Sequence, residues 1–128
     1  EALTLIGPDL EKYFDPTVKA YAEMADKMGG HIPPNMLYIQ TAQAAKDATM
    51  AHFILKNYRE GSTFIHCNSA YHSKNFEGIM WYLKQENPNL KILTIHCVEQ
   101  KSLKKLALEN ESTAHFIIVT PESMTQAH

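Results

Sequence analysis

A polar turn, Asn68-Ser69-Ala70-Tyr71-His72-Ser73, carries the side chains best suited to chemistry. It follows a β-branched and aromatic run and precedes a helix-forming stretch, so His72 is presented beside a predicted helix N-terminus. Backbone N–H groups at such a terminus favour an anion, for example a phosphate or a carboxylate. In the alternative interpretation, Ser69, Ser73 and Asn75 only cap the helix and His72 is a surface imidazole, because turns use these residue types routinely.

Two Ile-His-Cys triplets, at 65–67 and 95–97, end the first two predicted strands. If those strands are neighbours, His66 and His96 share one face of the sheet, and Cys67 and Cys97 share the other. The imidazole pair is a weak candidate for a metal site, because zinc sites usually gather three or four ligands. The thiols would be close enough to bridge, but two buried cysteines are the favoured expectation, since free cysteine is among the most buried residue types.

The elements that position these residues begin with two helices. Asp15-Pro16 and Gly29-Gly30 are start and stop signals that predict a helix over 16–28. A longer helix is predicted over 36–59, which lacks Gly and Pro and has one apolar stripe: Leu37, Ala44, Ala48, Ala51, Leu55 and Tyr58. Gln43, Asp47, Met50 and Ile54 lie one residue round from that stripe, so the amide and the carboxylate need polar partners.

Three strands are predicted after residue 60, at 62–67, 91–97 and 115–119, with helices at 76–85 and 101–109 between them. This alternation predicts an α/β fold in which long N-terminal helices precede a β-α-β-α-β unit with a parallel sheet. Because the strands lack polar and apolar alternation, both sheet faces are expected to be covered. We expect residues 1–60 to pack on the sheet formed by 61–128, in one domain.

The composition limits the classes of partner. A net charge of −2 and the absence of a basic cluster beyond Lys101, Lys104 and Lys105 argue against nucleic acid as a partner. Hydrophobic residues make up 45% of the chain, yet no run of 18 apolar residues occurs, so we expect no membrane span in this chain. Any export signal or lipid anchor is expected outside it.

Two motifs resemble those of ChaN-like proteins, a haem-binding family of the Tiki/erythromycin-esterase-like superfamily. The first is the run Gln43 to Ala51, which is similar to Gln-x-x-Arg-Asp-x-x-Met-Ala with lysine at Lys46 in place of arginine. Lysine keeps the charge but loses the planar two-pronged donor group, so a carboxylate clamp there is weaker. The second is the 68–73 turn with the following helix, which resembles Asn-Gly-Ala-Tyr-His-Ser and has Ser69 in place of glycine.

The resemblance covers residues 36 to 120 and lacks one family motif, a Gly-Glu-x-His near the start of the full-length domain. We therefore expect this chain to be the C-terminal part of a larger ChaN-like domain. The resemblance implies a bacterial haem-binding protein of the cell envelope, lipoprotein-anchored or periplasmic, that serves haem or iron uptake. A site shared between two subunits would make it a homodimer.

The residues implied to contact haem or its propionates are Gln43, Lys46, Asp47, Asn68, Tyr71 and His72. Tyr71 is a candidate ligand because a phenolate suits ferric haem. Phe76, Met80, Trp81 and Tyr82 would line an apolar wall, although such a stripe is more often core. Two alternatives stay open: a metal-dependent hydrolase in which His72 helps to activate water, and a non-catalytic structural piece. A binding protein is favoured over an enzyme.

Overall fold

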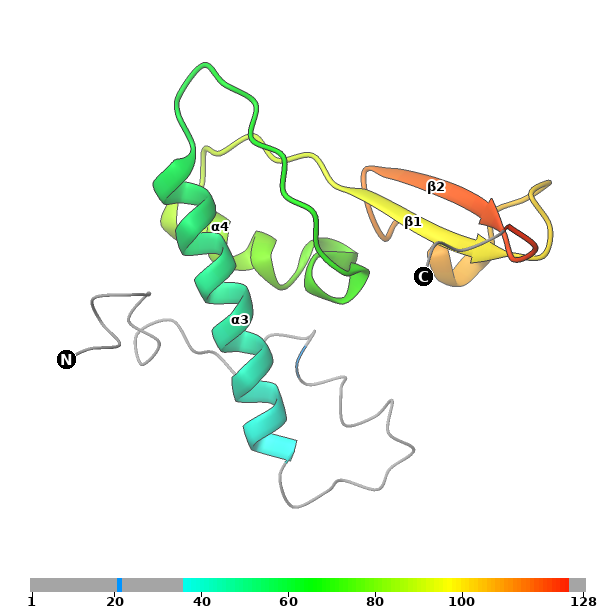
Figure 1. Ribbon diagram of the computed structural model, residues 1–128, viewed down its shortest axis with the longest axis horizontal. Helices are drawn as coiled ribbons and strands as arrows, with labels where there is room; N and C mark the ends of the chain where they lie inside the picture. The colour runs from blue at the N-terminus through cyan, green and yellow to red at the C-terminus, as the bar shows by residue number, and fades with distance from the viewer. Residues whose placement is uncertain (1–20, 22–35, 125–128) are drawn as a thin grey trace.

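The computed structural model describes Tyr21 and residues 36–124 (Figure 1). The predicted helix at 16–28 lies outside the described residues except for Tyr21, which is helical. Helix α3, Met36–Asn57, confirms the long helix predicted over 36–59. Its alanine stripe is buried, with Ala44 1%, Ala48 4% and Ala51 2% exposed. These small side chains let another helix approach α3 closely.

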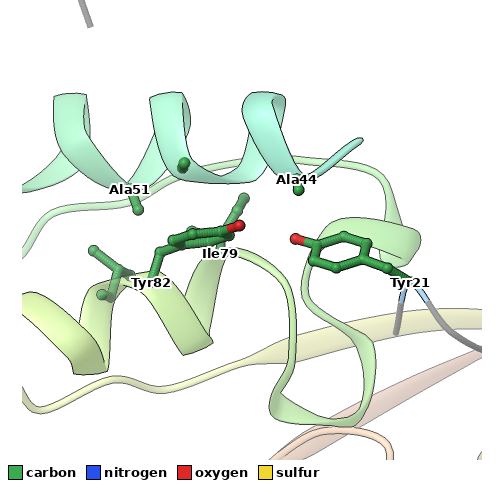
Figure 2. Close-up of a cluster of buried hydrophobic side chains, with 7 residues drawn as sticks. Tyr21, Ala44, Ala51, Ile79 and Tyr82 are labelled. Carbon is green, nitrogen blue, oxygen red and sulfur yellow. The ribbon is translucent and has the colours of Figure 1, made fainter. Parts of the chain in front are cut away.

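Helix α4, Ile79–Glu86, packs against the alanine stripe of α3. Ile79 and Tyr82 are buried there (Figure 2), and so is Leu83. Burying an apolar side chain of this size stabilises a fold by roughly 1.5–3 kcal/mol. The helix was predicted over 76–85 and starts later, because residues 74–76 form a 3-10 turn and Gly78 has φ 59°. It ends where the Asn87 backbone N–H donates to the Leu83 carbonyl, just before Pro88.

The sheet has two parallel strands within the described part of the chain, β1, Ile95–Gln100, and β2, Phe116–Pro121. Ile95 pairs with Phe116, and the register continues to Gln100 opposite Pro121. Figure 1 shows the sheet to one side of the α3–α4 pair. The predicted α/β class, with helices preceding parallel strands, is confirmed. The strand predicted over 91–97 begins further along the chain, at Ile95. The strand predicted over 115–119 is β2, which begins one residue later than predicted.

Two predicted elements are wrong. Residues 62–67 are not a strand: the segment is exposed, with Ile65 81% accessible, and the described residues form a sheet of β1 and β2 alone. Residues 101–109 are not an α-helix and contain only the start of a 3-10 turn at Leu108–Asn110. The Gln100 side chain competes with a helix there, because its Nε2 donates to the Lys105 carbonyl (2.7 Å) and its Oε1 accepts from the Ala107 N–H (3.2 Å).

The expectation that both sheet faces are covered is also wrong. One face presents Ile95, Phe116 and Ile118 at 58%, 58% and 50% exposure. Cys97 lies on the same face opposite Ile118, and both Cys97 and Cys67 are exposed and unbridged, so the expected burial of the two thiols is wrong. The sequence pattern predicted fully buried strands because apolar side chains occupy both of their faces. Burial depends instead on which elements pack against those faces.

No helix among residues 36–124 is long and apolar enough to cross a membrane. The packing of residues 1–60 on the sheet as one domain stays a prediction, since most of residues 1–35 lie outside the description.

The alanine stripe gives a test of the helix pair. We expect Ala48→Leu to lower the free energy of unfolding by about 1–3 kcal/mol, because the larger side chain overpacks the α3–α4 contact. Ala42→Leu is the matched control, since Ala42 is exposed on the same helix. Urea unfolding of both variants measures the effect, and equal stability of the two would contradict the packing described.

Candidate functional site

Asp47 is the buried polar centre of the site. It lies on the inner side of α3 between Ala44 and Ala51, and only 1% of it is exposed. Both carboxylate oxygens have partners: Oδ2 accepts a 2.7 Å hydrogen bond from the Tyr21 hydroxyl, and Oδ1 lies 2.6 Å from Nδ1 of His72. The need for partners predicted from the helix pattern is thus met by two residues distant in sequence.

His72 comes to Asp47 from a tight turn. A 3-10 turn, Ala70–His72, is closed by the His72 N–H donating to the Ser69 carbonyl (3.0 Å). The Asn68 side chain adds bonds to the Ser69 carbonyl (2.8 Å) and to Oγ of Ser73 (3.0 Å). The imidazole is 17% exposed, so it bridges the buried carboxylate and the solvent. The turn predicted from the 68–73 run is present, although no strand precedes it.

Gly78 is the point at which α4, the His72 turn and α3 meet. It has φ 59° and ψ −122°, a backbone conformation that L side chains rarely adopt. A Cβ atom at this position would lie 2.4 Å from the His72 carbonyl oxygen and 3.0 Å from Oδ2 of Asp47. Glycine therefore allows the start of α4 to lie close to both members of the Asp47–His72 pair.

Burial controls the electrostatics of this group. It raises the pKa of the Asp47 carboxyl above its usual value, while the hydrogen bonds from Tyr21 and His72 and the nearby Lys46 partly lower it again. Burial, followed by the hydrogen bond to Asp47, raises the pKa of the Tyr21 phenol far above its ordinary range. Tyr21 therefore stays a neutral donor, and Asp47 is the member of the pair that accepts.

A pocket of about 430 Å³ opens beside His72. Its lining is Ala45, Lys46, Thr49 and Met50 from α3, together with His72. Because Nδ1 of His72 is turned to Asp47, Nε2 is the ring nitrogen left for a ligand or a proton. The pocket thus combines an apolar wall, an exposed lysine and an imidazole supported from behind by a carboxylate.

The structure brings most of the sequence-predicted site residues close together. Lys46 and His72 line the pocket, and Asp47 lies directly behind His72. Tyr71 adjoins the pair, with its ring edge-on to that of His72 at a centroid distance of 6.1 Å. Gln43 lies one turn before Asp47 and has a buried Oε1 without a hydrogen-bond partner among the described residues. Direct contact of any of these residues with a cofactor stays a prediction.

His66 and His96 do not share a sheet face, so the geometry from which they were inferred as a metal pair is wrong. His66 lies in the exposed 62–67 segment, and β1 pairs with β2 instead. Nδ1 of His96 lies 3.0 Å from Oγ1 of Thr113, and burial, with the nearby charge of Lys74, lowers the pKa of His96. Within the described ranges, no three His, Cys, Asp or Glu side chains cluster as metal ligands.

Sequence reasoning missed Tyr21 as a member of the site. It lies 26 residues before Asp47, inside a predicted helix with no motif to single it out. The positive φ of Gly78 was not foreseen either. The available signal was chemical: a carboxylate on an alanine stripe requires donors, but the sequence does not say which residues supply them.

A comparison with protein families agrees with this assignment of motifs. The family described as haem-binding uptake, Tiki superfamily, ChaN, matches residues 4–83. The match includes residues 4–35, where the sequence analysis identified no family motif. It ends within α4, before the strands. Nothing among curated proteins or solved structures matches the chain significantly.

Substitution of Gly78 tests the close contact. We expect Gly78→Ala to cost about 3 kcal/mol or more, because it adds a steric clash to the strain of a positive φ. Gly61→Ala is the control: Gly61 also has a positive φ of 80°, but a Cβ there meets nothing within 4 Å. That variant should lose only about 1–2 kcal/mol. Urea unfolding compares the two, and equal losses would show that the clash is absent.

The raised pKa of Asp47 predicts a pH dependence of stability. Because the folded state holds this proton more tightly than the unfolded chain, the contribution is complete below the unfolded pKa of about 4. It is lost as the pH rises through the folded-state pKa. We expect Asp47→Asn to remove this component, so its free energy of unfolding should decline less than that of the wild type as the pH rises above about 4.

Urea unfolding at several pH values measures this difference. Glu86→Gln, which neutralises an exposed carboxylate on α4, is the control and should keep the wild-type slope. The same slope in Asp47→Asn and in the wild type would show that Asp47 titrates normally.

Proposed function

The chain belongs to the ChaN family of haem-binding uptake proteins in the Tiki superfamily, and on that premise we propose that it binds haem at the pocket beside His72. The family description supports haem as the class of ligand. The residues proposed to contact haem are inferred from the geometry of this chain.

The observation that carries the proposal is the pairing of His72 with Asp47. A histidine that ligates a metal commonly donates its other ring N–H to a carboxylate, which orients the ring and raises the basicity of the ligating nitrogen. Here Nδ1 lies 2.6 Å from a carboxylate oxygen of Asp47, and His72 lines the pocket, so Nε2 is the ring nitrogen left for a ligand. Bound haem would supply an iron centre that takes an imidazole or a phenolate as axial ligand.

The other pocket residues fit a haem edge. Met50 and Ala45 offer apolar contact to a porphyrin, and the ammonium group of Lys46 would pair with a propionate as a point charge. Tyr71, next to His72, is the second candidate ligand. In this proposal Asp47 acts through His72, because only 1% of it is exposed, and Asn68 holds the turn.

The shape of the pocket bears on oligomeric state and location. Among the described residues its lining comes from α3 and one turn, which would cover one face of a porphyrin and leave the other for a second subunit. We therefore retain the homodimer as part of the proposal. Haem or iron uptake at a bacterial cell envelope, through a lipoprotein or a periplasmic protein, agrees with the uptake function in the family name.

A second candidate is a metal-dependent hydrolase of the wider superfamily. The Asp47–His72 pair favours it, because a carboxylate behind an imidazole is also how a general base is oriented toward water. Zinc-dependent ester hydrolysis that is lost in His72→Ala, without hemin binding, would support this candidate over the first.

A hemin titration tests the proposed function. We expect a Soret band in the wild type and an affinity weaker by about tenfold or more in His72→Ala, because the ligating nitrogen is removed. Tyr71→Phe separates the two candidate ligands, since it should alter the band only if the phenolate binds iron. His66→Ala is the control and should behave as the wild type, because His66 is exposed outside the pocket. An unchanged titration in both His72→Ala and Tyr71→Phe would reject the site.

A further inference from the structure

Tyr21 is a fully buried residue whose hydroxyl and backbone carbonyl both form hydrogen bonds near the site. It is 0% exposed, its hydroxyl donates to Oδ2 of Asp47 at 2.7 Å, and its backbone carbonyl accepts from Nε2 of Gln40 at 2.8 Å. Gln40 and Asp47 are both on α3, so Tyr21 is held at two points of the same helix. A buried tyrosine hydroxyl usually finds a hydrogen-bond partner, and here that partner is the carboxylate that lies behind His72.

The hydroxyl of Tyr82 extends this arrangement into the α3–α4 core. Tyr82 is 3% exposed on α4, and its hydroxyl interacts with that of Tyr21. Figure 2 shows the two phenolic oxygens pointing toward one another beneath the alanine face of α3. A row of polar groups therefore runs from Tyr82 through Tyr21 and Asp47 to His72, and it reaches the pocket only at the imidazole.

Each carboxylate oxygen of Asp47 has one hydrogen-bond partner. Oδ2 is occupied by the Tyr21 hydroxyl and closed in by Gly78, whose missing Cβ would lie 3.0 Å away. Only Oδ1 is left to face Nδ1 of His72. When Asp47 is ionised it has no proton to donate, so the proton between these atoms then belongs to Nδ1.

We propose that Tyr21 is a positioning residue for His72: by fixing the Asp47 carboxylate through Oδ2, its hydroxyl holds the imidazole as the Nδ1–H tautomer, with Nε2 unprotonated at the pocket. The inference deepens the proposed function, on which its ligand-binding consequence rests. The tautomer itself is a property of the chain alone. Without the hydroxyl, Oδ2 is a buried acceptor with no donor, the carboxylate rotates to find one, and Nδ1 loses its fixed partner.

The direct test is ¹⁵N NMR of the histidine ring in the ligand-free protein. We expect the His72 signals of the wild type to show a protonated Nδ1 and a bare Nε2. Tyr21→Phe should shift the two ¹⁵N signals toward each other, as both tautomers become populated. Tyr38→Phe removes a phenol from an exposed position on α3, at 75% accessibility, and should leave the His72 signals unchanged.

Two results would overturn the inference. One is a wild-type His72 that carries its proton on Nε2, which needs no variant and so stands even if Tyr21→Phe does not fold. The other is a folded Tyr21→Phe, verified by circular dichroism, whose His72 signals match those of the wild type.

Hemin titration of the same proteins separates this inference from the proposed function. If the role of Tyr21 and the haem proposal are both correct, Tyr21→Phe binds hemin about tenfold more weakly than the wild type, because loss of an outer-shell partner typically weakens a metal site by that order. Tyr38→Phe should bind hemin as the wild type does. If the tautomer changes as expected but the wild type does not bind hemin, the role of Tyr21 stands and the haem proposal fails. A changed tautomer with unchanged hemin affinity would overturn the ligand-binding consequence.

Discussion

The described structure depends on one carboxylate placed where water does not reach it. Asp47 lies on the face of α3 that packs against the rest of the core, and burying a charge there is costly unless every lone pair facing the interior meets a donor. The donors come from two other parts of the chain, Tyr21 and the His72 turn. Satisfying Asp47 therefore holds three separate segments together and, by the same bonds, orients the imidazole at the surface.

Small residues make this arrangement sterically possible. The alanines of α3 bring α4 close, and Gly78 lets the start of α4 approach the His72 carbonyl and Asp47 more closely than any side chain would permit. The turn is also tied from its other side, because the Asn75 N–H donates to the Thr113 carbonyl at 2.9 Å, in the loop that leads into β2. The imidazole is thus placed by backbone contacts as well as by its own hydrogen bond. A ligand that meets Nε2 would find the ring already oriented.

The sheet contrasts with this tightly connected region. Its two strands present Ile95 and Phe116 to solvent, and its contact with the site runs through the loop before β2. Residues 62–67 show why strands were harder to predict than helices. A helix satisfies its hydrogen bonds within itself, so the propensities and alanine spacing of 36–59 were sufficient to predict α3. A strand needs a neighbour, and β-branched residues alone do not create one.

The sequence by itself determined the long helix, its buried stripe, the α/β class, the polar turn that presents His72 and, through two motifs, the family. These are local features, set by side-chain spacing and turn chemistry over a few residues. Only the tertiary structure decided which residue partners Asp47, which nitrogen of His72 is left for a ligand, and that Gly78 closes the site. It also decided that 101–109 is not an α-helix. There the Gln100 side chain forms hydrogen bonds with the backbone of Lys105 and Ala107, which a helix would satisfy within itself. Each of these depends on contacts between distant segments, and a linear pattern states that a buried carboxylate needs donors without stating where they lie.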